Sequence, residues 1–340
     1  NLPDVAVVPS ENFNTVLYSG NNTAQRQITG VGFQPSWTWI KGRTGTHAAN
    51  SHYLFDAVRG VGKQIKSNTT SAEATNTNNL YAFDSDGFSL GQSAVDSVTN
   101  GASTTFVAWN WKANGSGSSN TNGSITSTVS ANVDAGFSIV SYTGNATGGA
   151  TVGHGLSFAP EIIFQKNRNV ADNWSVWLTT LGTGKKLRLN STDAEASTGN
   201  YPTVPTSSLF YLGSGAEVNG SGNAMIAYCF HSVKGYSKVG SYTGNGNADG
   251  TFVYTGFRPA YVMVKKTDSA GNSWSILDTK RNTFNPMSKD IAADFTDAEY
   301  DRTSIHTDVT ANGFKFRGTN SWTNASGGTY IYLAFAEQPF

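Results

Sequence analysis

Three segments of the chain follow one pattern, and this internal repetition restricts the fold more than any other feature of the sequence. Each copy holds a Tyr-x-Gly turn, then a Phe-x-Pro corner, and then an apolar stretch that ends in lysine. The proline follows the tyrosine by 17, 18 and 17 positions, and the lysine follows the proline by six positions in every copy. The repeated structural positions are Tyr18, Pro35 and Lys41, then Tyr142, Pro160 and Lys166, and finally Tyr242, Pro259 and Lys265.

The three copies also end alike, which defines the expected domain boundaries. Each closes on an apolar strand that follows a turn rich in asparagine or glycine. Residues 114–122 read NGSGSSNTN, a composition typical of a flexible polar linker, whereas the second and third copies have no spacer and are expected to dock stiffly. The expected organisation is a first repeat at 1–113, a linker with a leading strand at 114–135, a second repeat at 136–235 and a third repeat at 236–340.

The composition favours short strands over helices. Only 14% of the residues are charged, glycine numbers 37, and the residues that build long helices are sparse. Stretches such as Phe252–Tyr254 and Phe314–Phe316 alternate with a period of two, which is typical of strands buried on one face. The sequence therefore predicts an all-β fold of three tandem antiparallel β-sandwich repeats, jelly-roll-like and each of roughly 100–115 residues.

Charge and cysteine content exclude several classes of protein. Lysine plus arginine and aspartate plus glutamate each number 23, so the formal net charge is +0 and nucleic-acid binding is not expected. No apolar run approaches the roughly 20 residues that cross a bilayer, so membrane insertion is not expected either. Cys229 is the single cysteine and cannot form an internal disulfide; its apolar surroundings predict a packed thiol.

The repeated lysine lies at even spacing from apolar residues of the same strand, for example Trp37 and Trp39 before Lys41. It therefore shares their face, where an ammonium group snorkels or pairs with a carboxylate. Candidate partners are Asp56 and Asp278, which are each followed three positions later by an arginine; the second copy lacks this pair. Retention in all three copies favours a structural role for the lysine.

Metal sites and cofactors are not expected from the sequence. His47 and His52 form the only close histidine pair, in a loop where we expect solvated side chains. Asp84-Ser-Asp86-Gly87 resembles the start of a calcium loop, but the glutamate that such a loop requires is missing. A hairpin turn is the preferred interpretation of this stretch.

Catalytic residues are not expected either. A glycosidase needs two carboxylates across a cleft, whereas Glu195, Glu217 and Glu299 lie in separate loops of the second and third repeats. Neither a nucleophile elbow nor a phosphate-binding loop occurs. We therefore expect no enzyme, with a glycan-degrading activity as the remaining enzymatic alternative.

Aromatic side chains outside the repeated pattern are the candidates for ligand binding, because sugars stack on exposed tryptophan and tyrosine rings. Trp174 and Trp274 occupy equivalent positions of two copies and are expected in the core. The candidate ligand-binding residues have no counterparts in the other copies and lie in turn-rich contexts: Trp177, Tyr201, Tyr300 and Trp322.

Several stretches resemble a known family of repeats. Residues 136–144, GFSIVSYTG, with His154-Gly-Leu, Ala159-Pro160 and Lys166-Asn-Arg168 after them, resemble the repeat of tail-fibre and other virion structural proteins of marine tailed phages, including cyanophages. Residues 228–245, 256–259 and 330–336 are similar to the same proteins. The resemblance covers most of the chain, and the first repeat matches more loosely than the other two.

The resemblance implies a location on the virion surface or outside cells, as a tail-fibre, receptor-binding or capsid-decoration protein. The expected partners are other virion proteins, a host-surface glycan, and further copies of the chain in a homo-oligomer, although no coiled-coil heptads enforce three strands. The second hypothesis is a secreted bacterial carbohydrate-binding or adhesive protein, and the third is a glycan-degrading enzyme. The sequence leaves the virion component, the ligand and the oligomeric state open.

Overall fold

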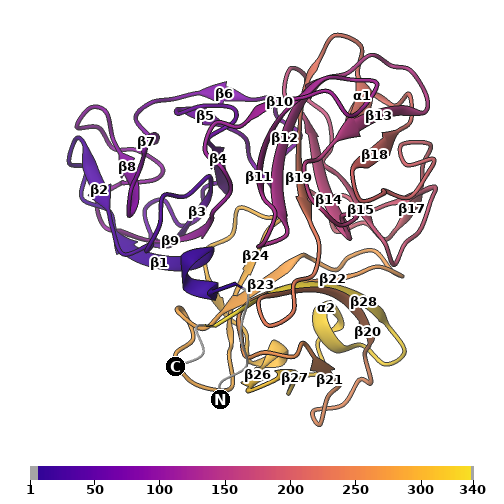
Figure 1. Ribbon diagram of the computed structural model, residues 1–340. Helices are drawn as coiled ribbons and strands as arrows, with labels where there is room; N and C mark the ends of the chain where they lie inside the picture. Colours follow the sequence, from indigo (N-terminus) through magenta and orange to yellow (C-terminus); the bar gives the residue numbers. More distant parts are fainter. Residues whose placement is uncertain (1–6, 338–340) are drawn as a thin grey trace.

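The computed structural model describes residues 7–337, whose regular secondary structure is almost entirely antiparallel strands, arranged as three lobes (Figure 1). Each lobe is built on one large sheet. The first large sheet contains, in spatial order, β1 (Phe13–Ser19), β9 (Thr104–Trp111), β3 (Trp37–Gly45) and β4 (Tyr53–Asp56). The second contains β10 (Ser118–Asn120), β11 (Ser127–Asn132), β12 (Phe137–Thr143), β19 (Ala224–Phe230), β14 (Ile162–Asn167) and β15 (Ser175–Leu178). The third contains β20 (Ser237–Thr243), β28 (Thr329–Ala336), β22 (Pro259–Lys266), β23 (Ser275–Asp278), β24 (Lys289–Ala292) and β25 (Tyr300–Asp301).

One strand order recurs in the three large sheets. It reads β1-β9-β3-β4 in the first, β12-β19-β14-β15 in the second and β20-β28-β22-β23 in the third. In each case the closing strand lies between the opening strand and the strand that follows the Phe-x-Pro corner. We call the three parts unit 1 (7–113), unit 2 (114–235) and unit 3 (236–337), after the predicted boundaries.

A smaller sheet faces each large sheet and encloses an apolar core of its own with it. The small sheets are β2 (Arg26–Ile28), β8 (Gly87–Leu90) and β7 (Leu80–Asp84) in unit 1, β13 (Ala150–Gly153) and β18 (Leu209–Leu212) in unit 2, and β21 (Phe252–Tyr254), β27 (Gly313–Phe316) and β26 (Thr307–Thr310) in unit 3. Two short pairs accompany them, β5 (Lys63–Gln64) with β6 (Ala74–Thr75) and β16 (Lys185–Lys186) with β17 (Ala196–Ser197). The short helices are η1 (Pro9–Glu11), α1 (Ala216–Asn219), η2 (Thr303–Ile305) and α2 (Ser321–Asn324). This architecture confirms the predicted all-β, sandwich-like fold.

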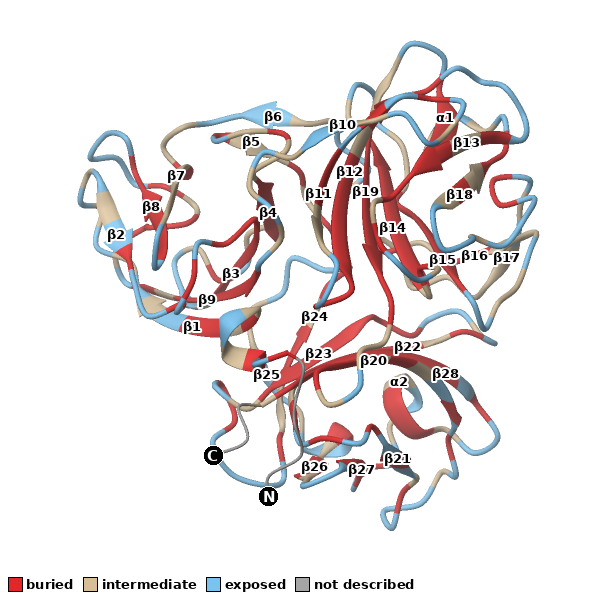
Figure 2. Ribbon diagram, in the orientation of Figure 1, coloured by how far each residue is buried: buried red, intermediate tan, exposed pale blue. Residues whose placement is uncertain are grey.

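The other faces of the three large sheets meet in one central core, where the buried strands of the three lobes converge (Figure 2). Rings from different units pack there directly: Trp37 of unit 1 stacks on Tyr228 of unit 2 with ring centroids 4.4 Å apart. Phe230 of unit 2 and Phe335 of unit 3 approach to 5.8 Å. The large sheets are therefore buried on both faces, and a strand such as β15 is buried at every position. The sequence did not predict this common core.

The three repeated tyrosines take the same role in their units. The hydroxyl groups of Tyr18, Tyr142 and Tyr242 donate to the backbone oxygens of Thr99, Val218 and Thr323, at 2.7, 2.6 and 2.6 Å. Each acceptor lies just before the closing strand of the unit, so the hydroxyl fastens the opening strand to the turn that leads into the closing one.

Residues 118–120, in the middle of the predicted flexible linker 114–122, instead form an edge strand of a sheet. Ser118–Asn120 form β10, which pairs antiparallel with β11, and the backbone NH of Asn114 donates to Ser130 Oγ at 2.8 Å. Backbone pairing at a sheet edge needs no apolar side chains, so a polar composition did not reveal the strand.

Two smaller predictions are confirmed. Asp84 and Gly87 pair across a tight turn between β7 and β8, so the Asp-Ser-Asp-Gly stretch is a hairpin. Cys229 is fully buried in the core that β19 shares with the small sheet of unit 2, and burial raises the pKa of its thiol.

Candidate functional site

The repeated lysines point their ammonium groups at backbone carbonyls rather than at carboxylates. Lys41 Nζ donates to the carbonyl oxygens of Gly42 (2.9 Å), Ala48 and Thr296 (3.2 Å). Lys166 Nζ donates to Asn167 O at 2.7 Å, and Lys265 Nζ donates to Asn272 O. Burial lowers the pKa of Lys41 to about 7 and those of Lys166 and Lys265 to about 8.

The predicted pairing of these lysines with Asp56 and Asp278 is wrong. Asp56 instead binds Arg59, and Asp278 binds Arg281, with all four side chains fully buried. An arginine three residues after the aspartate reaches both a carboxylate oxygen and nearby backbone carbonyls, so it satisfies the buried charge more completely than a distant lysine.

These aspartates also join the units. The hydroxyl of Tyr228 in unit 2 donates to Asp56 Oδ2 of unit 1 at 2.6 Å. At the equivalent contact, Trp109 Nε1 of unit 1 donates to Asp278 Oδ2 of unit 3 at 3.0 Å. The corresponding positions between units 3 and 2 hold leucines, all in or against the central core: Leu333, Leu178 and Leu181.

A second set of contacts between units has the same order, in which unit 2 donates to unit 1 and unit 1 contacts unit 3. Trp174 Nε1 of unit 2 donates to Lys66 O of unit 1, and Trp274 Nε1 of unit 3 donates to Arg188 O of unit 2, both at 2.8 Å. His52 Nε2 of unit 1 lies 3.0 Å from Ala292 O of unit 3 and closes the ring. His52 thus occupies the position that tryptophan holds in the other two units.

The glutamates considered for catalysis lie in ion pairs and do not form a pair across a cleft. Glu299 binds Arg43 and Arg281, and Glu217 binds Lys186. Glu195 binds Lys185 at 3.0 Å. Each carboxylate therefore holds chain segments together, and of these pairs Glu299–Arg43 joins two units.

The prediction of solvated histidines is wrong for both members of the pair. His52 is fully buried against Trp39, and burial lowers its pKa well below the usual value. His47 is held between Asp96 and Asn50, with 2.8 Å contacts to each. Between residues 7 and 337 no cluster of three or more histidine, cysteine, aspartate or glutamate side chains is arranged to hold a metal ion.

Two of the four candidate ligand-binding residues are buried, so those predictions are wrong. Trp177 and Tyr201 both lie in the core between the large and small sheets of unit 2. Trp177 donates its indole NH to Gly182 O at 2.9 Å. The error arises because the large sheet is covered on both faces, so that a ring on the second face of β15 is as buried as one on the first.

The other two candidates, Tyr300 and Trp322, are brought together by Arg302. The guanidinium carbon lies 4.8 Å from the centre of the Tyr300 ring and 4.3 Å from that of Trp322. Tyr300 is 60% exposed and Trp322 is half-buried. We call these three residues the Tyr300 site. The arginine was not predicted, although its position two residues after Tyr300 on an extended segment was a usable signal.

Neighbouring polar groups fix the geometry of the Tyr300 site. Arg302 Nε lies 3.4 Å from Asp290 Oδ2, and Ser275 Oγ donates to the other oxygen of this buried carboxylate at 2.6 Å. Asn320 caps α2 by accepting from the Trp322 NH at 2.8 Å, and its amide donates to Ser304 Oγ at 3.0 Å. Because the cation covers one face of each ring, the solvent face of Tyr300 remains as a flat stacking surface.

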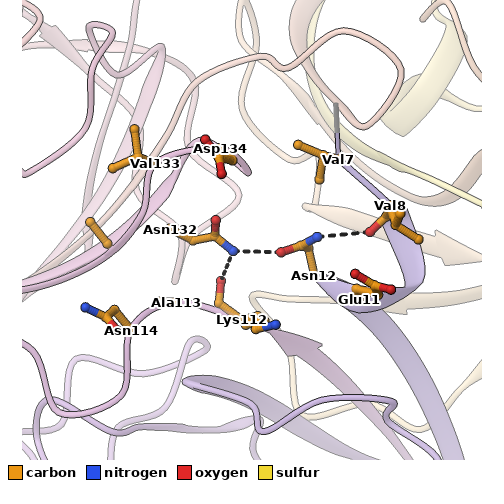
Figure 3. Close-up of a pocket in the computed structure, with 11 residues that line it drawn as sticks. Val7, Val8, Glu11, Asn12, Lys112, Ala113, Asn114, Asn132, Val133 and Asp134 are labelled. Carbon is orange, nitrogen blue, oxygen red and sulfur yellow. Dashed lines mark hydrogen bonds between the residues drawn. The ribbon is translucent and has the colours of Figure 1, made fainter. Parts of the chain in front are cut away.

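A cleft of about 470 Å³ between units 1 and 2 is an alternative site (Figure 3). Two of its polar side chains bind each other: Asn132 Nδ2 donates to Asn12 Oδ1 at 2.7 Å, and it also donates to the backbone oxygen of Lys112 at 3.2 Å. Asn12 in turn donates to Val8 O at 2.9 Å. These two amides join the units across the cleft. None of the described residues that line it is aromatic, so the cleft offers no ring on which a sugar could stack.

Comparison with known proteins gives a family but no activity. No helix within residues 7–337 is long and apolar enough to cross a membrane. The chain has no match among the curated proteins and none among the solved structures. A family model described as a domain of unknown function, DUF7483, matches residues 8–339, and the chain therefore belongs to the DUF7483 family.

Proposed function

We propose that this chain is a non-enzymatic structural protein of a phage virion, acting as a tail-fibre, receptor-binding or capsid-decoration protein whose unit 3 contacts glycans on the host surface. The virion assignment rests on the sequence resemblance of residues 136–168 and 228–259 to marine phage structural proteins. The glycan assignment rests on the Tyr300 site.

The single observation that carries glycan binding is the exposed Tyr300 ring backed by Arg302. A ring held by a cation on one face is rigid, so a sugar that stacks on the other face costs little side-chain entropy. The guanidinium edge beside it supplies donors for sugar hydroxyl or carboxylate groups.

The rest of the molecule suits a rigid support for such a site. The central core, the buried aspartate–arginine pairs and the ring of indole contacts tie the three units into one body. A virion protein outside the cell must keep its shape without repair, and close packing of this kind favours slow unfolding.

The test is binding of the purified chain to an array of bacterial surface glycans, with Tyr300→Ser as the variant and Phe158→Ser, an exposed aromatic of unit 2, as the matched control. Loss of one stacking ring is worth about 1 kcal/mol, so we expect Tyr300→Ser to bind about five- to tenfold more weakly while the control binds normally. Equal binding of all three proteins would exclude the Tyr300 site as the contact.

The two alternatives separate in further measurements. A secreted bacterial adhesin would show the same glycan binding, but immunogold labelling would mark the cell surface instead of phage particles, and no capsid, portal or terminase genes would lie nearby. A glycan-degrading enzyme would release new reducing ends from the array, which the virion proposal does not allow.

A further inference from the structure

Exposed aromatic side chains concentrate in unit 3. Six phenylalanine or tyrosine side chains are exposed among residues 7–337, and five of them belong to unit 3: Phe252, Tyr254, Phe284, Phe295 and Tyr300. Two of the five, Phe252 and Tyr254, lie on one strand. Isolated exposed rings are ordinary, whereas clustered ones mark contact surfaces, so this strand is a candidate contact surface.

The outer face of the small sheet in unit 3 presents these two rings side by side. Val253 between them is buried, whereas Phe252 is 45% exposed and Tyr254 is 64% exposed. Across the pairing with β27, Phe252 lies opposite Lys315 and Tyr254 opposite Gly313. A Cβ atom at Gly313 would come within 3.0 Å of the Phe252 ring, so the missing side chain lets that ring lie close over the sheet.

The other two units show that the fold does not require these rings. Val253 pairs with Phe314, just as Ile28 pairs with Phe88 in unit 1 and Val152 with Phe210 in unit 2. The residues that flank the buried position are Gln27 and Thr29 in unit 1 and Thr151 and Gly153 in unit 2. The aromatic pair is therefore a specialisation of unit 3.

We propose that the outer face of this sheet, which we call the β21 face (Phe252, Tyr254, Lys315 and Asp308), is a second glycan-binding surface that takes an extended polysaccharide together with the Tyr300 site. This inference rests on the proposed function and deepens it. Rings two residues apart on a strand lie about 7 Å apart, so they offer consecutive stacking surfaces along a sugar chain.

Charged groups border the two rings. Lys315 Nζ binds Asp249 Oδ1 at 2.6 Å, and Arg317 Nε binds Asp308 Oδ2 at 2.6 Å. Asp249 is largely exposed and Arg317 is exposed to a similar extent as Phe252, so these groups retain free donors and acceptors for sugar hydroxyls. A protein partner fits less well, because two rings set among charges give a much smaller apolar area than a standard protein interface.

The β21 face and the Tyr300 site are within reach of one polysaccharide. Tyr300 in β25 and Asp308 in β26 are eight residues apart, and a chain extends at most about 3.6 Å per residue, so the two positions are no more than about 29 Å apart. A glycan of several sugar units spans this distance. Its second contact is then intramolecular, which strengthens binding to long chains more than to short ones.

The experiment is affinity electrophoresis in gels that contain soluble bacterial O-chain or capsular polysaccharides, with dextran as the neutral comparison. The variant is Phe252→Gln with Tyr254→Thr, which installs the residues of unit 1, and the control is Phe158→Gln in unit 2. Circular dichroism melting checks that both variants fold. We expect the double variant to need at least tenfold more polysaccharide for the same retardation, with a smaller loss on short oligosaccharides from the same polymer.

Each outcome decides between the two proposals. If the polysaccharide retards the double variant as strongly as the wild type, the proposal for the β21 face is overturned and the Tyr300 site remains. If the wild type migrates freely in every gel, both proposals are overturned. A double variant that alters the molar mass in light scattering without altering retardation would show that the β21 face contacts protein, which also overturns the inference.

Discussion

The buried Asp56–Arg59 pair gives the sharpest test of how the units are held together. Its partners reach across the interface: Tyr228 of unit 2 donates to Asp56, and Arg59 contacts Glu73, which binds Arg168 of unit 2. The equivalent interface between units 2 and 3 has no such chain, because leucines stand at 178, 181 and 333. Unit 2 thus supplies a natural apolar version of the same contact.

We predict that Asp56→Leu alone is strongly destabilising. It leaves the Arg59 guanidinium, whose side chain is fully buried, with only the Glu73 carboxylate at 3.2 Å, and it removes the acceptor of the Tyr228 hydroxyl. Breaking a buried ion pair costs about 3–5 kcal/mol, and the stranded hydroxyl adds about 1 kcal/mol, so we expect a loss of about 4–6 kcal/mol.

Removing the whole polar group should be much milder. The triple variant Asp56→Leu, Arg59→Leu and Tyr228→Phe reproduces the apolar chemistry of the leucine contact and leaves no buried charge unpaired. Tyr228→Phe keeps the ring that stacks on Trp37. We expect the triple variant to recover most of the loss, to within about 2 kcal/mol of the wild type.

Urea unfolding followed by tryptophan fluorescence measures both effects, with Tyr228→Phe as a separate control. The reasoning is refuted if Asp56→Leu costs less than about 1 kcal/mol, since Arg59 would then not depend on its carboxylate. It is refuted equally if the triple variant is as unstable as the single one, because the contact would then depend on shape and not on charge.

Three further predictions concern buried groups. Burial lowers the pKa of Lys41 to about 7, below its value in the unfolded chain, so the unfolded state binds more protons above pH 7 and stability should rise from about pH 7 toward pH 10. Lys41→Met should reduce this slope in urea unfolding at pH 7 to 10, leaving the part that Lys166 and Lys265 contribute, and an unchanged slope would contradict the assignment. Cys229 is fully buried and burial raises the pKa of its thiol, so maleimide should label it only in denaturant; rapid labelling of the native chain would show that the core of unit 2 opens. Tyr142→Phe removes the donor to Val218 O and the acceptor of Gln165 Nε2, so it should cost about 1–2 kcal/mol in the same urea assay; a neutral effect would mean that the hydroxyl does not fasten β12.

Much of the fold was predictable because the repeated residues have local roles. The tyrosine, proline and lysine positions mark the opening strand, the corner and the central strand of each unit, and local strand and turn signals suffice to find such elements. The second buried face of the large sheets was not predictable in this way. Alternating hydrophobicity indicates only one buried face. Trp177 on β15 was predicted to be accessible because no residue near it in the sequence indicates the small sheet that covers it.

The candidate site divides along the same line. Tyr300 and Trp322 were selected because they lack counterparts in the other copies. This criterion identifies an accessible ring only where no second sheet covers that side of the strand. Arg302 was not predicted because its contact with Trp322 of α2 joins residues about twenty positions apart in the sequence. Phe252 and Tyr254 escaped it because alternating aromatics were interpreted as a buried face, whereas Val253 is the residue that faces the core.

The arrangement of faces explains where this chain has freedom to change. In each unit the large sheet contacts the central core on one face and the small sheet on the other, so a substitution there disturbs two sets of neighbours. In units 1 and 3 the outer positions of the small sheet are exposed, and glutamine and threonine in unit 1 stand where unit 3 has phenylalanine and tyrosine. Ligand recognition is therefore expected on these outer faces and their connecting loops. Transplanting Phe252 and Tyr254 to the equivalent positions of unit 1, as Gln27→Phe with Thr29→Tyr, should then leave the melting temperature unchanged within about 2 °C.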